Sequence, residues 1–159
     1  MDLKFTVMIH VSRPVAQVFE AVADPKELSS YFTTGGASGR LEAGTTVTWD
    51  FHDFPGAFPV EVVEVVPNER IVLKWEANEG PPDAAADGPK GAGYSTVATM
   101  SFKPTEDGRT LVQIEEKGWR ETEAGLAASY GNCMGWSQML AALKMWVEHR
   151  INLREGAYR

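Results

Sequence analysis

The sequence contains only one cysteine among its 159 residues, so no disulfide can form within the chain. Disulfides belong to oxidising compartments, and a chain of this length can bury a sufficient core without them. The N-terminal residues also lack the apolar run of about 7 to 15 residues that marks a signal peptide. These absences are typical of a soluble protein without a membrane span, and we expect a cytoplasmic location.

Positive charge is sparse as well. Lys and Arg number 15 against 22 Asp and Glu, which gives a formal net charge of −7. No basic run occurs, whereas nucleic-acid backbones are bound by clustered Lys and Arg. Metal-ligand spacings such as Cys-x-x-Cys are also lacking. We therefore expect no nucleic-acid partner, no metal and no cofactor, and the length predicts a single domain over residues 1–159.

The N-terminal part of the chain predicts a strand followed by two short helices. Residues 3–11 are rich in β-branched and apolar side chains, which is typical of a strand. We expect Ser12 to cap the first helix and Asp24 to cap the second, with Pro25 at the first helical position. The second helix should end near "YFTTGG", where glycines interrupt the helical pattern.

From residue 37 to residue 117 the apolar residues alternate with polar ones, which indicates β-strands. Turn sequences such as "PNE" and "TEDGR" join the strands into antiparallel hairpins. Residues 78–93, rich in Pro, Gly, Ala and Asp, show neither period, and we expect a mobile loop insertion there. The predicted strands cover residues 45–51, 58–66, 70–77, 95–104 and 110–119, with a weaker one at 37–43.

The segment "GNCMGWSQMLAALKMWVEHR", residues 131–150, predicts a long amphipathic helix. Its apolar stripe includes Cys133, Trp136, Leu140 and Leu143, and its other side is polar. The segment is too polar to span a bilayer, and its apolar width suits a helix laid across a sheet. We expect an α+β domain in which a strongly bent antiparallel sheet wraps this helix.

Several motifs resemble the helix-grip (START-like, birch-pollen-allergen-like) folds of the START-like (SRPBCC) superfamily. Within it, the chain is similar to the activator of heat shock protein 90 ATPase homologue family. The resemblance implies a curved antiparallel sheet around a long C-terminal helix, with two short helices after the first strand. The motifs are "IHVSRPVAQVFEAVADPKELSSYF", "GTTVTWDF", "VVEVVPNERIVLKWE", "STVATMSFKPTEDGRTLVQIEEKGW" and "GWSQMLAALKMWVE".

A helix that crosses a curved sheet can leave a cavity, and the resemblance favours one here. The same side chains can instead fill a packed core, as aromatic and methionine residues usually do. Tyr31, Phe32 and Tyr94 are either residues of a cavity mouth or ordinary turn aromatics. The candidate lining residues are Trp49, Phe51, Trp75, Trp119, Trp136, Met139 and Leu143.

Few polar side chains are candidates for chemistry. Arg150, at the end of the predicted helix, is either a polar anchor for an anionic head group, a partner for an acid such as Glu115 or Glu116, or a cation at the helix C-terminus. His52 and Asp53 form the only His/acid cluster, for which we expect a solvated hairpin turn.

These observations leave three functions open. The first is a binding protein that holds a small apolar or amphipathic molecule. The second, implied by the resemblance, is a chaperone-associated protein resembling heat shock protein 90 ATPase activators. The third is an enzyme of the polyketide cyclase/dehydratase type, which ranks below binding because the sequence shows no strong acid/base pair. The chain is expected to be a monomer or a homodimer.

Overall fold

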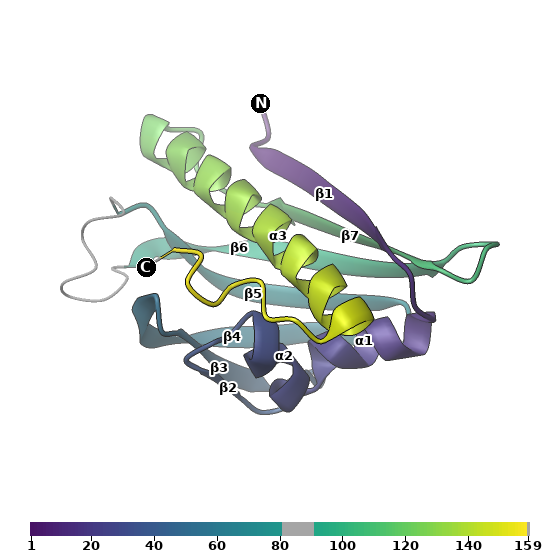
Figure 1. Cartoon of the computed structure of the whole chain (residues 1–159). Coiled ribbons are helices and arrows are strands. Elements are labelled where there is room, and N and C mark those ends of the chain that lie inside the picture. Colours follow the sequence, from purple (N-terminus) through teal and green to yellow (C-terminus); the bar gives the residue numbers. More distant parts are fainter. Residues whose placement is uncertain (81–90, 159) are drawn as a thin grey trace.

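The computed structural model describes residues 1–80 and 91–158. Its centre is a sheet of seven antiparallel strands in the order β1-β7-β6-β5-β4-β3-β2 (Figure 1). The predicted insertion at 78–93 falls largely outside the described residues. The strands are β1 Lys4–Val11, β2 Gly36–Ser38, β3 Thr46–Phe51, β4 Phe54–Val66, β5 Arg70–Asn78, β6 Gly91–Pro104 and β7 Thr110–Lys117.

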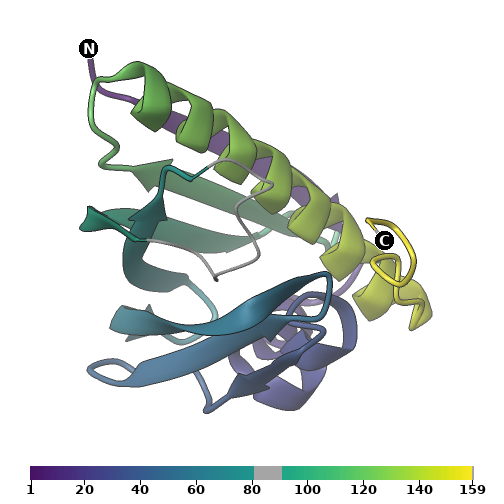
Figure 2. The ribbon, with the colours of Figure 1, turned by 90° about the vertical axis from the view of Figure 1, so that its left-hand side faces the viewer.

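Three helices cover one face of the sheet. They are α1 Val15–Ala23, α2 Pro25–Tyr31 and α3 Glu123–His149. Helix α3 lies along β1, and the sheet bends away from it towards β4 and β3 (Figure 2). The short helices α1 and α2 lie together beneath the C-terminal end of α3 (Figure 1). This confirms the α+β helix-grip fold expected from the sequence.

The bend of the sheet coincides with irregular strand pairing. The register shifts between Trp49 and Phe51 in β3, between Val62 and Glu64 in β4, and again near the end of β5. Such bulges bend a strand and increase its twist. The sheet therefore curves where its aromatic side chains are concentrated, and its concave face is turned towards α3.

The predicted N-caps of the two short helices are correct for α2 and wrong for α1. Asp24 caps α2 as predicted, because its side chain accepts a hydrogen bond of 2.9 Å from the N–H of Lys26. The prediction that Ser12 caps α1 is wrong. Pro14 occupies that position and makes no side-chain cap, while the Ser12 N–H donates instead to Glu148 on α3.

Helix α3 begins at Glu123, eight residues before the predicted start at 131. Thr122 caps it by accepting a hydrogen bond from the N–H of Gly125 at 3.0 Å. Gly125 is buried, and a Cβ atom at this position would lie 2.0 Å from the carbonyl oxygen of Arg120. This close contact explains why position 125 is a glycine. Because glycine has a low helix propensity, the sequence does not predict the first turns of α3.

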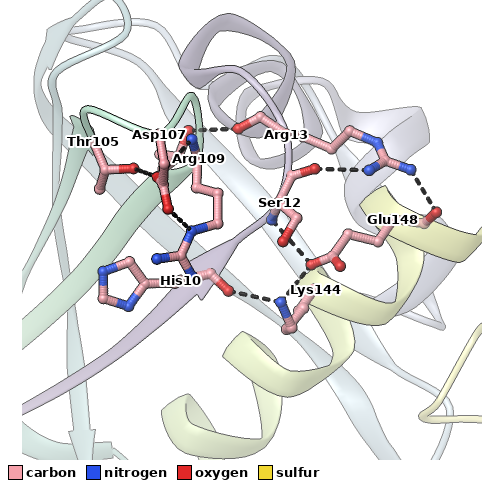
Figure 3. Close-up of polar contacts among 9 residues, drawn as sticks. His10, Ser12, Arg13, Thr105, Asp107, Arg109, Lys144 and Glu148 are labelled. Carbon is pink, nitrogen blue, oxygen red and sulfur yellow. Dashed lines mark hydrogen bonds and ion pairs between the residues drawn. The ribbon is translucent and has the colours of Figure 1, made fainter.

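A group of polar contacts joins the β1–α1 connection to the last turns of α3 (Figure 3). Glu148 accepts hydrogen bonds from Lys144 Nζ at 2.6 Å and from the Ser12 N–H at 3.1 Å. Lys144 Nζ also donates to the carbonyl oxygen of His10, and the Arg13 guanidinium donates to that of Glu148. These contacts fix α3 against the end of β1.

The Glu148 carboxylate should make part of the stability depend on pH. Burial opposes its ionisation, but the hydrogen bonds from Lys144 and Ser12 outweigh burial and lower its pKa below the ordinary value. A carboxylate with a lowered folded-state pKa stabilises the fold above its unfolded pKa, and this contribution is lost as pH falls through the folded value. Glu148→Gln should therefore lose more stability at about pH 7 than at about pH 3.5, measured by urea unfolding.

Glu106→Gln is the matched control, because Glu106 is exposed and makes no hydrogen bond within the part of the chain that the structure describes. Its unfolding free energy should follow that of the wild type at both pH values. Equal losses for Glu148→Gln at both pH values would contradict the assigned role of this carboxylate.

Candidate functional site

Six aromatic side chains meet between α3 and the concave face of the sheet. We call them the aromatic cluster. The alternation of β3 places Trp49 and Phe51 on the same face, and Trp49 lies directly opposite Phe58 of β4. The members are Phe32, Trp49, Phe51, Phe58, Trp75 and Trp136.

Phe32, which follows α2, lies at one centre of the cluster. Its ring centroid is 5.6 Å from that of Trp49, 5.0 Å from that of Phe51 and 5.7 Å from that of Trp136. Trp75 forms a second centre, 5.3 Å from Trp136 and 5.8 Å from both Trp49 and Phe58. These separations are those of favourable aromatic pairs, so the rings pack against one another.

The cluster is buried on one side and reaches solvent on the other. Trp49 and Trp136 are 0% and 2% exposed, whereas Phe51, Phe58 and Trp75 are half-buried. The predicted lining residues Met139 and Leu143, on α3, are fully buried in the adjoining core. Side chains therefore occupy the space beneath the C-terminal half of α3, and the partly exposed rings lie along β3, β4 and β5.

One carboxylate lies entirely within this apolar surrounding. Glu116 of β7 has no exposed surface, and four side chains donate hydrogen bonds to it. Its Oε1 atom accepts from Trp75 Nε1 at 2.8 Å, Thr96 Oγ1 at 2.7 Å and Asn132 Nδ2 at 3.0 Å. Its Oε2 atom accepts from Trp136 Nε1 at 2.6 Å. The four donors supply the compensation that a buried carboxylate requires.

Glu116 also determines how two rings of the aromatic cluster are held. Trp75 and Trp136 come from β5 and α3, and both indole N–H groups point to the same carboxylate. The sequence suggests Glu116 only as a possible partner for Arg150. The alternation along β7 nevertheless indicates its burial, because Glu116 lies on the same inward-facing side as Val112 and Ile114.

A second buried charge lies near Phe51. Asp53 pairs with Arg154 of the C-terminal tail, with Nη2 at 3.1 Å from Oδ1 and 2.8 Å from Oδ2. Their side chains are 3% and 9% exposed. The guanidinium of Arg154 lies 4.8 Å from the ring centre of Phe51 and 4.7 Å from that of Tyr158. The prediction of a solvated turn is therefore wrong for Asp53, because the tail folds back over it, although His52 is exposed.

Two nitrogen donors in this region have no acceptor within residues 1–80 and 91–158. They are Trp49 Nε1 and Arg154 Nε, and both atoms are buried. Both side chains contact the ring of Phe32. A buried donor without an acceptor costs about 1 to 3 kcal/mol, so such groups usually meet a water molecule or a ligand.

The predicted site residues Tyr31, Trp119 and Tyr94 lie outside the aromatic cluster. Tyr31 is fully buried and donates to the carbonyl oxygen of Ala21 at 2.9 Å, and burial raises the pKa of its hydroxyl well above the ordinary value. Trp119 packs against Phe5 and lines a surface depression of about 500 Å³ beside residues 2–4. Tyr94 is half-buried, donates to Glu79 and accepts from the Arg120 N–H.

Arg150 also lies away from the cluster. It ends α3 in the left-handed conformation, with φ of 57°, and pairs with Glu27 of α2 at 2.7 Å. The Glu27 carboxylate accepts a second hydrogen bond, from Trp146 Nε1 at 2.8 Å. The expected acidic partner of Arg150 is therefore present, but it is Glu27 and neither Glu115 nor Glu116. Arg150 instead fastens the end of α3 to α2.

A curved antiparallel sheet that holds a long C-terminal helix, with two short helices after the first strand, defines the helix-grip class of proteins. Residues 12–148 match the family model described as activator of Hsp90 ATPase homolog 1-like protein, and the chain belongs to this family. No match was found among curated proteins. None of the described helices is long and apolar enough to cross a membrane.

Solved structures with the same fold are similar over nearly the whole chain. SSP2350 from Staphylococcus saprophyticus is 24% identical with a TM-score of 0.75, and the match covers 96% of both chains. The Aha1 dimer from Colwellia psychrerythraea is 20% identical with a TM-score of 0.69, covering 92% of this chain and 97% of that one. DynU16, a protein of the dynemicin biosynthetic locus, is 23% identical with a TM-score of 0.72, covering 94% of this chain and 48% of DynU16.

Glu116→Gln should destabilise the protein by about 2 to 4 kcal/mol, because an amide cannot accept from all four donors and places its own N–H₂ against one of them. Urea unfolding at neutral pH measures the loss. Glu115→Gln is the control on the same strand, since Glu115 faces the other side of the sheet, and it should change stability by less than about 0.5 kcal/mol. Equal effects of the two substitutions would contradict the role assigned to Glu116.

Proposed function

We propose that the protein binds a small apolar or amphipathic molecule at the solvent-facing side of the aromatic cluster. The observation that carries the proposal is the row of three half-buried rings, Phe51, Phe58 and Trp75, on adjacent strands. Phe51 and Phe58 stack with centroids 5.9 Å apart, and Phe58 lies 5.8 Å from Trp75. Contiguous apolar surface on a concave face is typical of a ligand site.

The surroundings of these rings support binding of a molecule with few polar groups. Behind them lie the buried rings of Trp49 and Trp136, and the neighbouring polar groups are few and fixed in place. Glu116 holds Trp75 in position, while the pair of Asp53 and Arg154 borders Phe51. A rigid apolar surface of this kind binds a ligand with little loss of side-chain freedom.

The arrangement supports binding more than catalysis. The Glu116 carboxylate accepts hydrogen bonds from four side chains, and Asp53 is engaged by Arg154. A general base needs an oxygen within reach of a substrate proton, and both carboxylates are already occupied. The enzyme alternative would require one of them to exchange a present partner for a substrate.

An apolar naphthalene derivative should raise the melting temperature, and the rise should grow with the logarithm of its concentration above the dissociation constant, because a ligand that binds only the folded state stabilises it. Phe58→Ser should weaken binding about tenfold by removing the middle ring of the row. Val63→Ser is the control, since Val63 lies on the same strand and is 48% exposed. A melting temperature that stays constant in a broad screen of apolar ligands would argue against the binding function.

A second candidate is a chaperone-associated role, supported by the family match. The outer face of α3 exposes Leu126, Tyr130 and Met134 at successive helical turns, a surface that a protein partner could cover. This role predicts a change in ATP hydrolysis by purified heat shock protein 90, reduced by Tyr130→Ser. An unchanged rate of hydrolysis at saturating protein would exclude it.

A further inference from the structure

Among residues 1–80 and 91–158, the indole of Trp49 is the buried polar group of the aromatic cluster that has no hydrogen-bond acceptor. The indole N–H groups of Trp75 and Trp136 both donate to Glu116, but that of Trp49 has no hydrogen-bond acceptor among residues 1–80 and 91–158. Its ring neighbours, Phe32 and Trp75, carry no oxygen atom, and aromatic π systems are only weak acceptors. A ligand oxygen that accepts a hydrogen bond from this indole N–H would therefore remove the cost of leaving the donor unpaired.

Trp49 lies beside the part of the cluster that reaches solvent. Phe58 is its direct partner across the β3–β4 pairing, and Trp75 contacts it from β5. Both of these rings are half-buried. A ligand that packs on the exposed row therefore contacts two direct neighbours of Trp49. Because Trp49 itself is 0% exposed, the polar end of the ligand reaches the indole only when one of these two rings moves aside.

The charges nearby favour a neutral acceptor. Glu116 is a buried carboxylate joined to the cluster through Trp75 and Trp136, and its four hydrogen-bonding partners are all uncharged. The charge of Arg154 is already matched by Asp53. A second carboxylate brought into the same apolar region would be repelled by Glu116 and would lose its hydration.

We infer that the ligand is an apolar, ring-containing molecule with a neutral carbonyl oxygen, and that Trp49 Nε1 donates the hydrogen bond that orients it. This inference rests on the proposed binding function and adds the chemical class of the ligand. The rings supply most of the affinity through apolar contact, and the carbonyl oxygen supplies selectivity because it satisfies the unpaired donor.

Three probes with the same ring system separate the possibilities: acetylnaphthalene, ethylnaphthalene and naphthoate. Calorimetry with the whole chain should show acetylnaphthalene binding about five- to tenfold more tightly than ethylnaphthalene, with naphthoate weaker than acetylnaphthalene. Trp49→Phe should bring the ketone and the hydrocarbon within about twofold of each other. Trp119→Phe should leave the preference intact. The indole N–H of Trp119 is also buried without an acceptor in the described part of the chain, but Trp119 lies against Phe5 and outside the aromatic cluster.

A measurement on the unmodified protein covers the case in which Trp49→Phe does not fold. Among the five tryptophans, one indole N–H resonance should move downfield with acetylnaphthalene and stay in place with ethylnaphthalene. Equal affinities for ketone and hydrocarbon would overturn the inference while leaving the binding function intact. Tighter binding of naphthoate would overturn the neutral carbonyl, and no binding of any probe would overturn both proposals.

Discussion

The buried carboxylate of Glu116 is the interaction on which the rest of the site depends. It gathers donors from β5, β6 and α3 around one point on β7, so it links the long helix to the sheet through side chains of fixed direction. Apolar contact alone would allow α3 to slide, because hydrophobic burial has no direction. The hydrogen bonds to the fully buried Glu116 carboxylate oppose such sliding. Any shift of α3 would break one of them and leave a buried donor or carboxylate oxygen without a partner.

The same constraint shapes the surface that a ligand would meet. Trp75 and Trp136 are held by Glu116, while Phe51 is bordered by Arg154, which the buried Asp53 positions. The aromatic cluster thus lies between two buried charges, one compensated by neutral donors and the other by an opposite charge. Hydrogen bonds to Glu116 hold Trp75 and Trp136 in place, and within residues 1–80 and 91–158 the indole N–H of Trp49 has no acceptor.

The sequence predicted what depends on local pattern. Alternation in β3 places Trp49 and Phe51 on one face, and capping chemistry alone predicts that α2 starts at Asp24-Pro25. The sequence did not predict contacts between distant residues. Asp53 and Arg154 are 101 residues apart in the sequence. The residues next to Asp53 predict an exposed turn, and only the distant C-terminal tail buries its carboxylate. Residue type alone predicts that Trp119 lies with the other tryptophans, but its position past the end of β7 places it against Phe5.

The central claim is that the half-buried rings of β3, β4 and β5 form the ligand surface and that Glu116 holds this surface in place. A crystal structure of the protein saturated with acetylnaphthalene tests it most directly. The account predicts ligand density against Phe58 and Trp75, with the hydrogen bonds of Glu116 to Trp75 and Trp136 retained. Ligand density only on the outer face of α3 or in the depression beside Trp119, with the aromatic cluster unoccupied, would contradict it.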